Sequence, residues 1–396
     1  MNLLKLPDVR TVQDLKGKRV LVRASLNVPI ENGVVLNYFR IMRAMPTLLH
    51  LTRAGARVIL ITHVGRDPKS TVEPIYKVLK EHLAVTYVPR VIGKEVEEAI
   101  GTLKSGEALL LENIRSHEAE VTNNQDFAAK LASYGELYVN DDFANSHRRH
   151  ASMVGIPQFV ECCFGITFQK EYEELSRALK PESPSLFILG GAKFETKLPL
   201  LEKFSHTYDQ VFVGGALAND LFRAKGYEVG TSLTSGLRPE SLTLHKKENV
   251  VLPADVTVKG EKETRITDPD DVQQDESILD VGPKSVKVLA ELIKDAKTIL
   301  WNGPLGNYEH GFVEYTKQCA QHIAESSARS VVGGGDTIAA IESLAINDKF
   351  DFLSTAGGAM LTFLDTETLP AIDAVLESEY MLSDNQEGQA HSPSDT

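Results

Sequence analysis

Residues 185–197, SLFILGGAKFETK, decide the fold of this chain, because they run from an apolar stretch through a glycine turn into a helix. Lys193 and Lys197 lie four residues apart, so on a helix their side chains share one face. The N-terminus of a helix adds unpaired N–H groups and a partial positive charge. The stretch therefore predicts a strand, a turn suited to phosphate, and a helix that carries two ammonium groups.

Three more glycine-rich turns follow short apolar runs further along the chain. They are Val213-Gly214-Gly215, Val332-Gly333-Gly334-Gly335 and Ser354-Thr355-Ala356-Gly357-Gly358. Glycine lets a base or a phosphate approach the backbone closely. Neither a Walker loop nor a G-x-G-x-x-G fingerprint occurs at these turns. The lysine pair alone could equally be two solvated side chains, but four such turns predict backbone loops that converge on one polyphosphate.

A carboxylate and a hydroxyl, Asp336 and Thr337, come directly after the triple glycine. Asp336 is either a plain helix N-cap or a ligand for a hard cation, and magnesium on nucleotides takes only one or two protein carboxylates. Residues 301–304, WNGP, supply another turn at a strand end, and Glu309 after them is a candidate acceptor for ribose.

Short apolar runs alternate with helical patterns through most of the chain, which is typical of parallel sheets covered by helices. We expect helices at 41–54 and 127–132. We expect strands at 19–22, 58–62, 109–112, 137–141, 186–189, 211–213, 298–301, 330–332 and 352–354.

The length of 396 residues favours two domains over one core. A helical pattern at 168–179 is followed by two prolines within residues 180–184, KPESP, which end the helix and mark a boundary. The polar residues after Leu382 indicate a disordered tail. We expect a first domain at 1–164, a connecting helix at 165–180, a second domain at 181–370, a segment returning to the first domain at 371–381, and the tail at 382–396.

Arginines and histidines gather at the strand ends of the first half, where doubly wound sheets bind their ligands. Any single surface arginine is usually just solvated, but several on one sheet edge suit an anion, because guanidinium groups match carboxylate and phosphate oxygens. We expect a small ligand with more than one anionic group. The candidate residues are Arg23, Ser25, Asn27, Arg40, His63, Arg66, Arg115, His147, Arg148 and His150.

Composition excludes several classes of protein. A net charge of −13 argues against a nucleic-acid partner, and no apolar run is long enough to cross a bilayer or to act as a secretory signal, so we expect a cytoplasmic protein without a membrane partner. Cys162, Cys163 and Cys319 do not have the spacing of a disulfide framework or a metal site. The histidines lack carboxylates at ligand spacing, so we interpret them as donors or structural residues.

Taken together, these motifs resemble the phosphoglycerate kinase family. The matching pieces are VLVRASLNVPI, ITHVGR, LLLENIR, VNDDFANSHRRHAS, ILGGAKFETK, WNGPLG, VVGGGDT and STAGGA. The resemblance implies an α/β protein with two doubly wound, Rossmann-like parallel-sheet domains joined by a long helix and hinge, which close on their ligands. It also implies reversible phosphoryl transfer between 1,3-bisphosphoglycerate and ADP, giving 3-phosphoglycerate and ATP with Mg²⁺, by a monomer.

The resemblance carries roles onto individual positions. The residues that look like the site for 3-phosphoglycerate are Ser25, Asn27, Arg40, His63, Arg66, Arg115 and Arg148. Those that look like the nucleotide site are Lys197, Gly214, Gly215, Glu309, Gly334, Gly335, Asp336 and Thr337, with Asp336 as the metal ligand. Those expected to act on the transferring group are Arg40, Lys193, Lys197, Gly357 and Gly358.

The sequence departs from the family at a few positions. Ser25 stands where the family has Asp, Leu26 where it has Phe, Ala356 where it has Gly, and Asn307-Tyr308 where it has Val-Phe. Losing the carboxylate at position 25 removes an acceptor for the glycerate hydroxyl. Two alternatives therefore stay open: a catalytically weak, nucleotide-binding member of the family, and a kinase for a different small carboxylic acid.

Overall fold

A computed structural model describes residues 4–261 and 263–378, and the chain in it forms two compact units. Unit 1 takes the chain up to Glu173 and again from Thr368, and unit 2 takes Glu174 to Glu367. The boundary falls within helix α6 (Ile166–Ala178). The expected tail at 382–396 and residues 379–381 lie outside the described residues. Among the residues described, no helix has both the length and the apolar character needed to cross a membrane.

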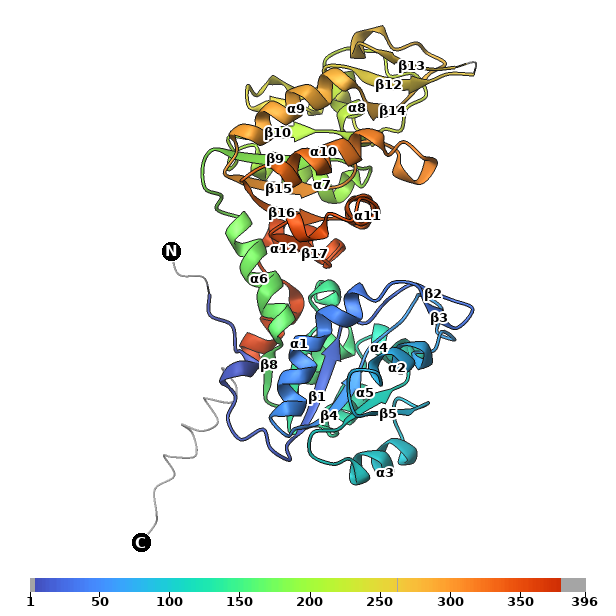
Figure 1. The fold of residues 1–396 in the computed structure, drawn as a ribbon, viewed down its shortest axis with the longest axis vertical. Helices are drawn as coiled ribbons and strands as arrows, with labels where there is room; N and C mark the ends of the chain where they lie inside the picture. Colours follow the sequence, from blue (N-terminus) through green and yellow to red (C-terminus); the bar gives the residue numbers. More distant parts are fainter. Residues whose placement is uncertain (1–3, 262, 379–396) are drawn as a thin grey trace. The chain divides into compact units, whose positions relative to one another are not determined.

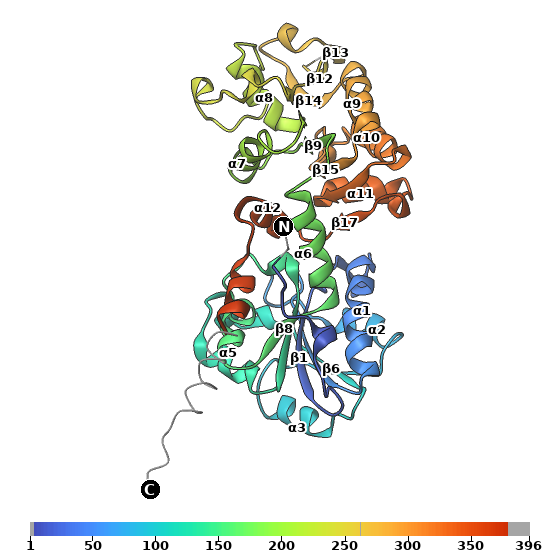
Figure 2. The ribbon, with the colours of Figure 1, turned by 90° about the vertical axis from the view of Figure 1, so that its left-hand side faces the viewer.

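Unit 1 contains a parallel sheet with strand order β5-β6-β4-β1-β7-β8. Figure 2 shows α1 (Phe39–Arg53) and α2 (Glu73–Leu79) on one side of this sheet and α5 (Gln125–Ala132) on the other. The strands are β1 (Arg19–Ala24), β4 (Arg57–Ile61), β5 (Val85–Val88), β6 (Ala108–Leu111), β7 (Leu137–Asp141) and β8 (Cys162–Phe164). Burial on both faces explains the apolar runs, because strands covered by helices on each side have no polar face.

The core of unit 1 forms where α1 packs on the central strands. Ile41, Ala44, Leu48 and Leu51 recur at helical spacing on α1, and all four are buried. They join one cluster with Val20 and its neighbours on the strands. The helix begins two residues earlier than the pattern predicts, at Phe39, because the Asn37 side chain accepts a hydrogen bond from the Phe39 N–H at 2.8 Å.

Unit 2 contains a second parallel sheet, with strand order β11-β10-β9-β15-β16-β17. Its strands are β9 (Ser185–Leu189), β10 (Gln210–Val213), β11 (Val250–Val251), β15 (Thr298–Asn302), β16 (Arg329–Gly333) and β17 (Phe352–Ser354). Helices α7 (Phe194–Phe204) and α8 (Gly215–Ala224) lie on one face and α9 (Pro283–Asp295), α10 (Glu314–Glu325) and α11 (Gly335–Ser343) on the other (Figure 2). The predicted fold class, two doubly wound parallel sheets, is confirmed.

An antiparallel sheet in unit 2 was not predicted from the sequence. It consists of β12 (Val256–Lys259), β13 (Thr264–Thr267) and β14 (Ser277–Val281), in the order β13-β12-β14 (Figure 1). Val256 and Val258 pack on Phe222 of α8, while the β13 side chains stay largely exposed. Such short, half-exposed strands carry little periodicity. The strands β5, β8 and β11 and the hairpin of β2 (Ile30–Glu31) with β3 (Val34–Val35) were also not predicted, because runs of two to four residues are too short to show a period.

Each sheet has one place where the chain reverses its direction of strand addition. It lies between β1 and β7 in unit 1 and between β9 and β15 in unit 2, and ligands of doubly wound sheets bind there. In unit 2 the backbones touch beyond the strand ends: the Gly190 N–H donates to the Asn302 carbonyl at 3.0 Å. A Cβ on Gly303 would lie 2.3 Å from the Gly190 oxygen and 2.5 Å from the Lys197 Nζ. Only glycine fits at this crossing.

The crossing predicts a specific stability defect for Gly303→Ala. Gly303 has φ +95° and would clash, whereas Gly311 has φ +85° with nothing within 4 Å, so Gly311→Ala is a control for backbone strain alone. We expect Gly303→Ala to lose about 2 kcal/mol more than Gly311→Ala, because overpacking adds to the strain. Thermal unfolding followed by the fluorescence of Trp301, the single tryptophan, measures both. Equal losses would contradict the steric argument.

Candidate functional site

The predicted arginine site of unit 1 lies along the carboxyl ends of β1, β4, β6 and β7. The Asn27 Oδ1 accepts from the Gly65 N–H at 2.9 Å, and Arg115 donates to the Gly65 carbonyl at 3.1 Å. Arg40 donates to the Ser25 hydroxyl at 3.2 Å. The Arg148 N–H donates to the Asn145 carbonyl at 2.9 Å. The bonds of Asn27 and Arg115 to Gly65 join the loops that follow β1, β4 and β6, and the charge of Arg148 from the loop after β7 acts on His63 and Arg115. The structure therefore brings the predicted residues into one cluster, with exposed Arg66 beside Gly65.

Positive charge dominates this cluster. Burial, followed by the charges of Arg23, Arg115, Arg148 and Arg40, holds the pKa of His63 well below its usual value. Burial and the nearby Arg148 and Arg23 lower the pKa of Arg115 to about 10. His63 is therefore neutral near pH 7, and the guanidinium groups repel one another. A ligand with several anionic oxygens would relieve that repulsion.

His63 is only 1% exposed, unlike Arg40, Arg66, Arg115 and Arg148. Its Nδ1 lies 2.9 Å from the Nη2 of Arg23, which is equally buried. Arginine carries only donors, so the His63 Nδ1 must accept and the ring proton sits on Nε2. His147 and His150 take part in no cluster of metal-ligating side chains within the described part of the chain.

Two residues of this site were missed in the sequence. Both are buried: Asp142 forms an ion pair with Arg23, and Asn145 accepts a hydrogen bond from Arg115. The signal for Asp142 was its place beside Asp141 at the end of a predicted strand, among arginines that need a counter-charge. Asn145 had no distinguishing signal, because a polar residue in a loop is ordinary.

The predicted phosphate site of unit 2 borders a cleft of about 550 Å³. Its lining includes Lys193, Gly215, Glu309 and Asp336 of the predicted set. Asn219, Asp280 and Tyr308 line it too, and sequence reasoning gave none of them a role. Gly334, Gly335, Gly357 and Gly358 begin helices after the neighbouring strands and do not line the cleft. Thr337 is buried, and its hydroxyl accepts from the Gly303 N–H at 3.1 Å.

Four helices that directly follow the glycine-rich turns at this sheet edge begin without a side-chain cap. They are α7, α8, α11 and α12 (Gly358–Thr366), and their N-caps are Lys193, Gly214, Gly334 and Gly357. The first N–H groups of a helix have no partner within the helix, so an uncapped N-terminus attracts an anion. Glycine caps at three of the four leave the backbone open to such a ligand.

Lys197 is the buried cation of this site. It is 4% exposed, and its Nζ donates to the Gly190 carbonyl at 2.5 Å. Burial, with a smaller contribution from Lys193, lowers the pKa of the Lys197 ammonium to about 8. An anion beside this group would stabilise its charged form and raise that pKa.

Asp336 fits a magnesium ligand. It is exposed in the first turn of α11, lines the cleft, and forms no ion pair with any residue that the structure describes. A hard cation held by one carboxylate, by phosphate oxygens and by water needs no further protein ligand. The residues present therefore suit a magnesium–nucleotide complex.

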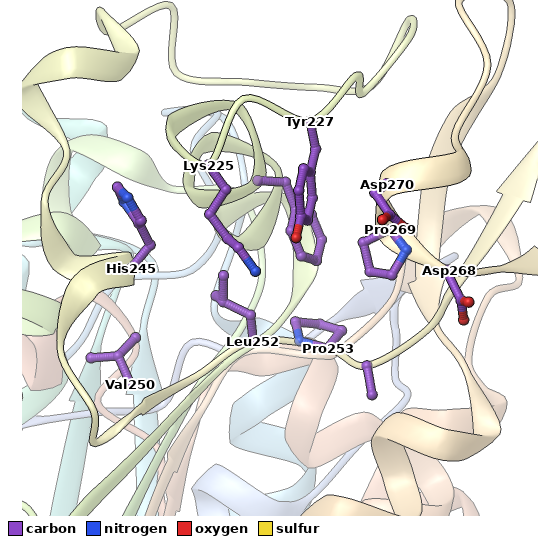
Figure 3. Close-up of a pocket in the computed structure, with 11 residues that line it drawn as sticks. Lys225, Tyr227, His245, Val250, Leu252, Pro253, Asp268, Pro269 and Asp270 are labelled. Atoms are coloured by element: carbon purple, nitrogen blue, oxygen red, sulfur yellow. The ribbon is translucent and has the colours of Figure 1, made fainter.

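A second hollow in unit 2, of about 470 Å³, does not share these features. Figure 3 shows Lys225 beside Tyr227, and the ammonium lies 4.6 Å from the ring centroid. Asp268 and Asp270 line the same hollow, which has no glycine turn. With acidic groups opposite its lysine, it is a poorer anion site than the cleft.

Comparison with known proteins gives one consistent result. A model of the family "Phosphoglycerate kinase" matches residues 9–367. The phosphoglycerate kinase of Dictyoglomus turgidum is 42% identical over 387 residues, covering 93% of this chain and 97% of that protein. The enzyme of that name from Francisella tularensis is 40% identical over 396 residues, covering 95% of this chain and 99% of its own.

Solved structures agree with the sequence relatives. Phosphoglycerate kinase from Coxiella burnetii superposes with a TM-score of 0.82 at 34% identity, covering 94% of this chain and 100% of that one. Phosphoglycerate kinase from Pyrococcus horikoshii superposes with a TM-score of 0.82 at 30% identity, covering 95% of this chain and 100% of that one.

Burial of Lys197 predicts that this side chain destabilises the protein at neutral pH. The pKa of Lys197 is 10.5 in the unfolded chain and about 8 in the folded protein. Between these pH values the unfolded chain binds more protons than the folded protein, so the free energy of unfolding rises with pH across that window. Lys197→Met should raise the free energy of unfolding by about 2 kcal/mol at pH 7, after allowing for the lost hydrogen bond, and less at pH 10. Urea unfolding followed by Trp301 fluorescence tests this.

Lys193→Met is the matched control, because Lys193 is exposed at the start of the same helix. It should change the free energy of unfolding far less than Lys197→Met does at both pH values, because it removes only the smaller contribution that Lys193 makes to the lowered Lys197 pKa. A Lys197→Met variant that is no more stable than its parent at pH 7 would contradict the burial argument.

Proposed function

Because the chain belongs to the phosphoglycerate kinase family, we propose that its two units divide one phosphoryl-transfer reaction, the acid binding on unit 1 and the nucleotide on unit 2. The reaction of the family is reversible transfer between 1,3-bisphosphoglycerate and ADP, giving 3-phosphoglycerate and ATP. One observation supports the division of roles: candidate anion-binding residues gather near the reversal point of each sheet, arginines in unit 1 and uncapped helix starts with a buried lysine in unit 2.

The unit 1 site suits 3-phosphoglycerate. Its carboxylate and phosphate carry charge at both ends of a short molecule, and planar guanidinium groups bind such oxygens in pairs. Arg66 and Arg148 are exposed and available, while Arg40 and Arg115 are held half-buried by bonds to neighbouring loops. Ser25, which bonds to Arg40, offers the glycerate hydroxyl a neutral partner.

The unit 2 cleft suits a nucleotide. Gly214 and Gly215 would let the base approach, Glu309 would accept from the ribose, and the uncapped helix starts with Lys197 would hold the phosphates. Asp336 would hold Mg²⁺. Bound to the phosphates, the ion would neutralise charge that develops during transfer.

The transfer needs charge stabilisation more than covalent chemistry from the protein. Arg40 and Lys193 are proposed to stabilise the negative charge on the phosphoryl group during its transfer. The N–H groups of Gly357 and Gly358 at the start of α12 would assist them. The protein is proposed to act as a cytoplasmic monomer; the free cysteines Cys162, Cys163 and Cys319 agree with a reducing compartment.

A kinase for a different small carboxylic acid is the second candidate, and Ser25 favours it. A coupled assay with purified protein, 3-phosphoglycerate, ATP and Mg²⁺ decides between the two. Turnover with 3-phosphoglycerate at least tenfold above that with other 2-hydroxy or 3-phospho acids supports the first. Turnover only with another acid supports the second, and none with any acid indicates the catalytically weak alternative.

We expect Lys193→Ala to lower turnover about a hundredfold, the usual effect of removing one charge that acts on the transferring group. Calorimetric affinity for ADP should change little. Lys225→Ala, at the other hollow of unit 2, is the control and should keep full turnover. Near-normal turnover of the Lys193 variant would remove this residue from the proposed mechanism.

We expect Asp336→Asn to weaken the binding of magnesium–ADP about tenfold or more, because the amide keeps the shape of the side chain but loses the charge that a hard cation requires. Titration calorimetry should show unchanged binding of 3-phosphoglycerate, since that ligand is assigned to unit 1. Asp348→Asn, an exposed carboxylate after α11, is the control. A loss of binding for both ligands would mean general damage to the fold.

A further inference from the structure

A fully buried carboxylate, Asp142, lies beneath the cluster of arginines in unit 1. It follows β7 directly and caps the short helix η3 (Phe143–Asn145). Its side chain is 0% exposed, and its Oδ2 lies 2.8 Å from the Nη1 of Arg23, which is 1% exposed. A buried guanidinium without such a partner is strongly destabilising, so the two charges depend on each other.

One set of bonds runs from Asp142 through Arg23 to His63. The Arg23 Nη1 forms an ion pair with Asp142 and donates a hydrogen bond to the Ala24 carbonyl at 2.9 Å. The Nη2 faces the His63 Nδ1 at 2.9 Å, and the Nε donates to the Ser152 hydroxyl at 3.1 Å. The guanidinium is thereby fixed on three sides. Its position obliges the His63 Nδ1 to accept, which leaves Nε2–H as the only donor of that ring.

A second set of bonds runs from Asp142 through Asn145 to Arg115. The Asn145 amide nitrogen donates to both Asp142 oxygens, at 3.0 and 2.9 Å. This orients the Asn145 Oδ1 outward, where it accepts from the Arg115 Nη2 at 3.2 Å. Arg115 bonds in turn to the Gly65 carbonyl, beside Asn27 and Arg66. One carboxylate therefore connects residues from four strand ends.

A second buried carboxylate nearby has different partners. Glu120 accepts from the Ser152 hydroxyl at 2.7 Å and from the Ser152 N–H at 2.9 Å. Within the described part of the chain, it forms no hydrogen bond or ion pair with Arg23 or with the residues proposed to bind the acid. Its charge nevertheless acts on Arg23 and Arg115, and its Oε1 lies 3.7 Å from the His150 Nδ1. Glu120 therefore matches Asp142 in burial and charge but not in connection.

We propose that Asp142 is a positioning residue for the acid substrate, holding His63 in its Nε2–H form through Arg23 and aiming Arg115 through Asn145. Asp142 also supplies a buried negative charge to the arginine cluster. This matters in this chain because Ser25 replaces the carboxylate that the family has at position 25. The assignment of His63 and Arg115 to the acid rests on the proposed function. The connection of Asp142 to both side chains is independent of it.

The first experiment examines His63 without any substrate. In nitrogen-15 NMR of histidine-labelled protein, the ring nitrogens of His63, assigned with His63→Gln, should show one tautomer, protonated on Nε2. Asp142→Asn should give a mixture of forms, because Arg23 loses its charged anchor, while Glu120→Gln should keep the single form. An unchanged His63 in a folded Asp142→Asn variant overturns the first set of bonds.

The second experiment measures binding by calorimetry and KM in the coupled assay. Asp142→Asn should weaken binding of 3-phosphoglycerate and raise its KM by about tenfold to a hundredfold, the usual effect of losing a charged hydrogen bond. The KM for ATP should stay within about twofold, which also shows that unit 2 is intact. Glu120→Gln should change the KM for 3-phosphoglycerate far less. Equal effects of the two variants on this KM overturn the proposal.

Asn145→Ala separates the two sets of bonds and removes no charge. It should weaken 3-phosphoglycerate binding through Arg115 and leave the His63 spectrum unchanged. Unaltered binding in this variant overturns the path to Arg115. If the parent protein does not bind 3-phosphoglycerate at all, the proposed function fails, and the His63 spectra still decide whether Asp142 controls that ring.

Discussion

Parallel pairing fixes where chemistry can occur in this protein. When β1 pairs with β4 and β7, and β9 pairs with β10 and β15, every connecting loop at the carboxyl ends leaves from the same edge. Side chains that are far apart in sequence are therefore brought together by the strand pairing itself. The backbone crossing of Gly190 with Gly303 depends on the same pairing and leaves no room for a side chain at either position.

The two edges handle charge in opposite ways. Unit 2 relies on backbone dipoles, with uncapped helix starts and one buried ammonium whose pKa has fallen to about 8. Unit 1 relies on guanidinium groups and balances them with buried carboxylates. In both units the arrangement opposes stability, because like charges are held close together or a cation is taken out of water. A bound anion would reduce the repulsion between the arginines of unit 1 and would stabilise the charged form of Lys197 in unit 2.

Much of the fold and of the candidate site could be predicted, because the signals are local. Strands at 137–141 and 352–354 match the structure without change, since each begins with apolar residues and ends with a polar residue before a turn. The arginines and glycine turns were found because position after a strand is readable from sequence. The sheet of β12 to β14 was not, because its short strands pair with one another across loops and alternate only weakly.

By itself, the sequence determined two doubly wound sheets, and it predicted at which edge of each sheet a ligand binds and which charged residues gather there. Tertiary structure alone decided that the Lys197 ammonium is buried against a carbonyl, that His63 lies under the surface, and that Asp142 joins Arg23 to Asn145. The physical reason is the distance along the chain over which each signal acts. Periodicity and turn chemistry act over a few neighbouring residues, whereas burial and the pairing of charges depend on which strand ends meet in space.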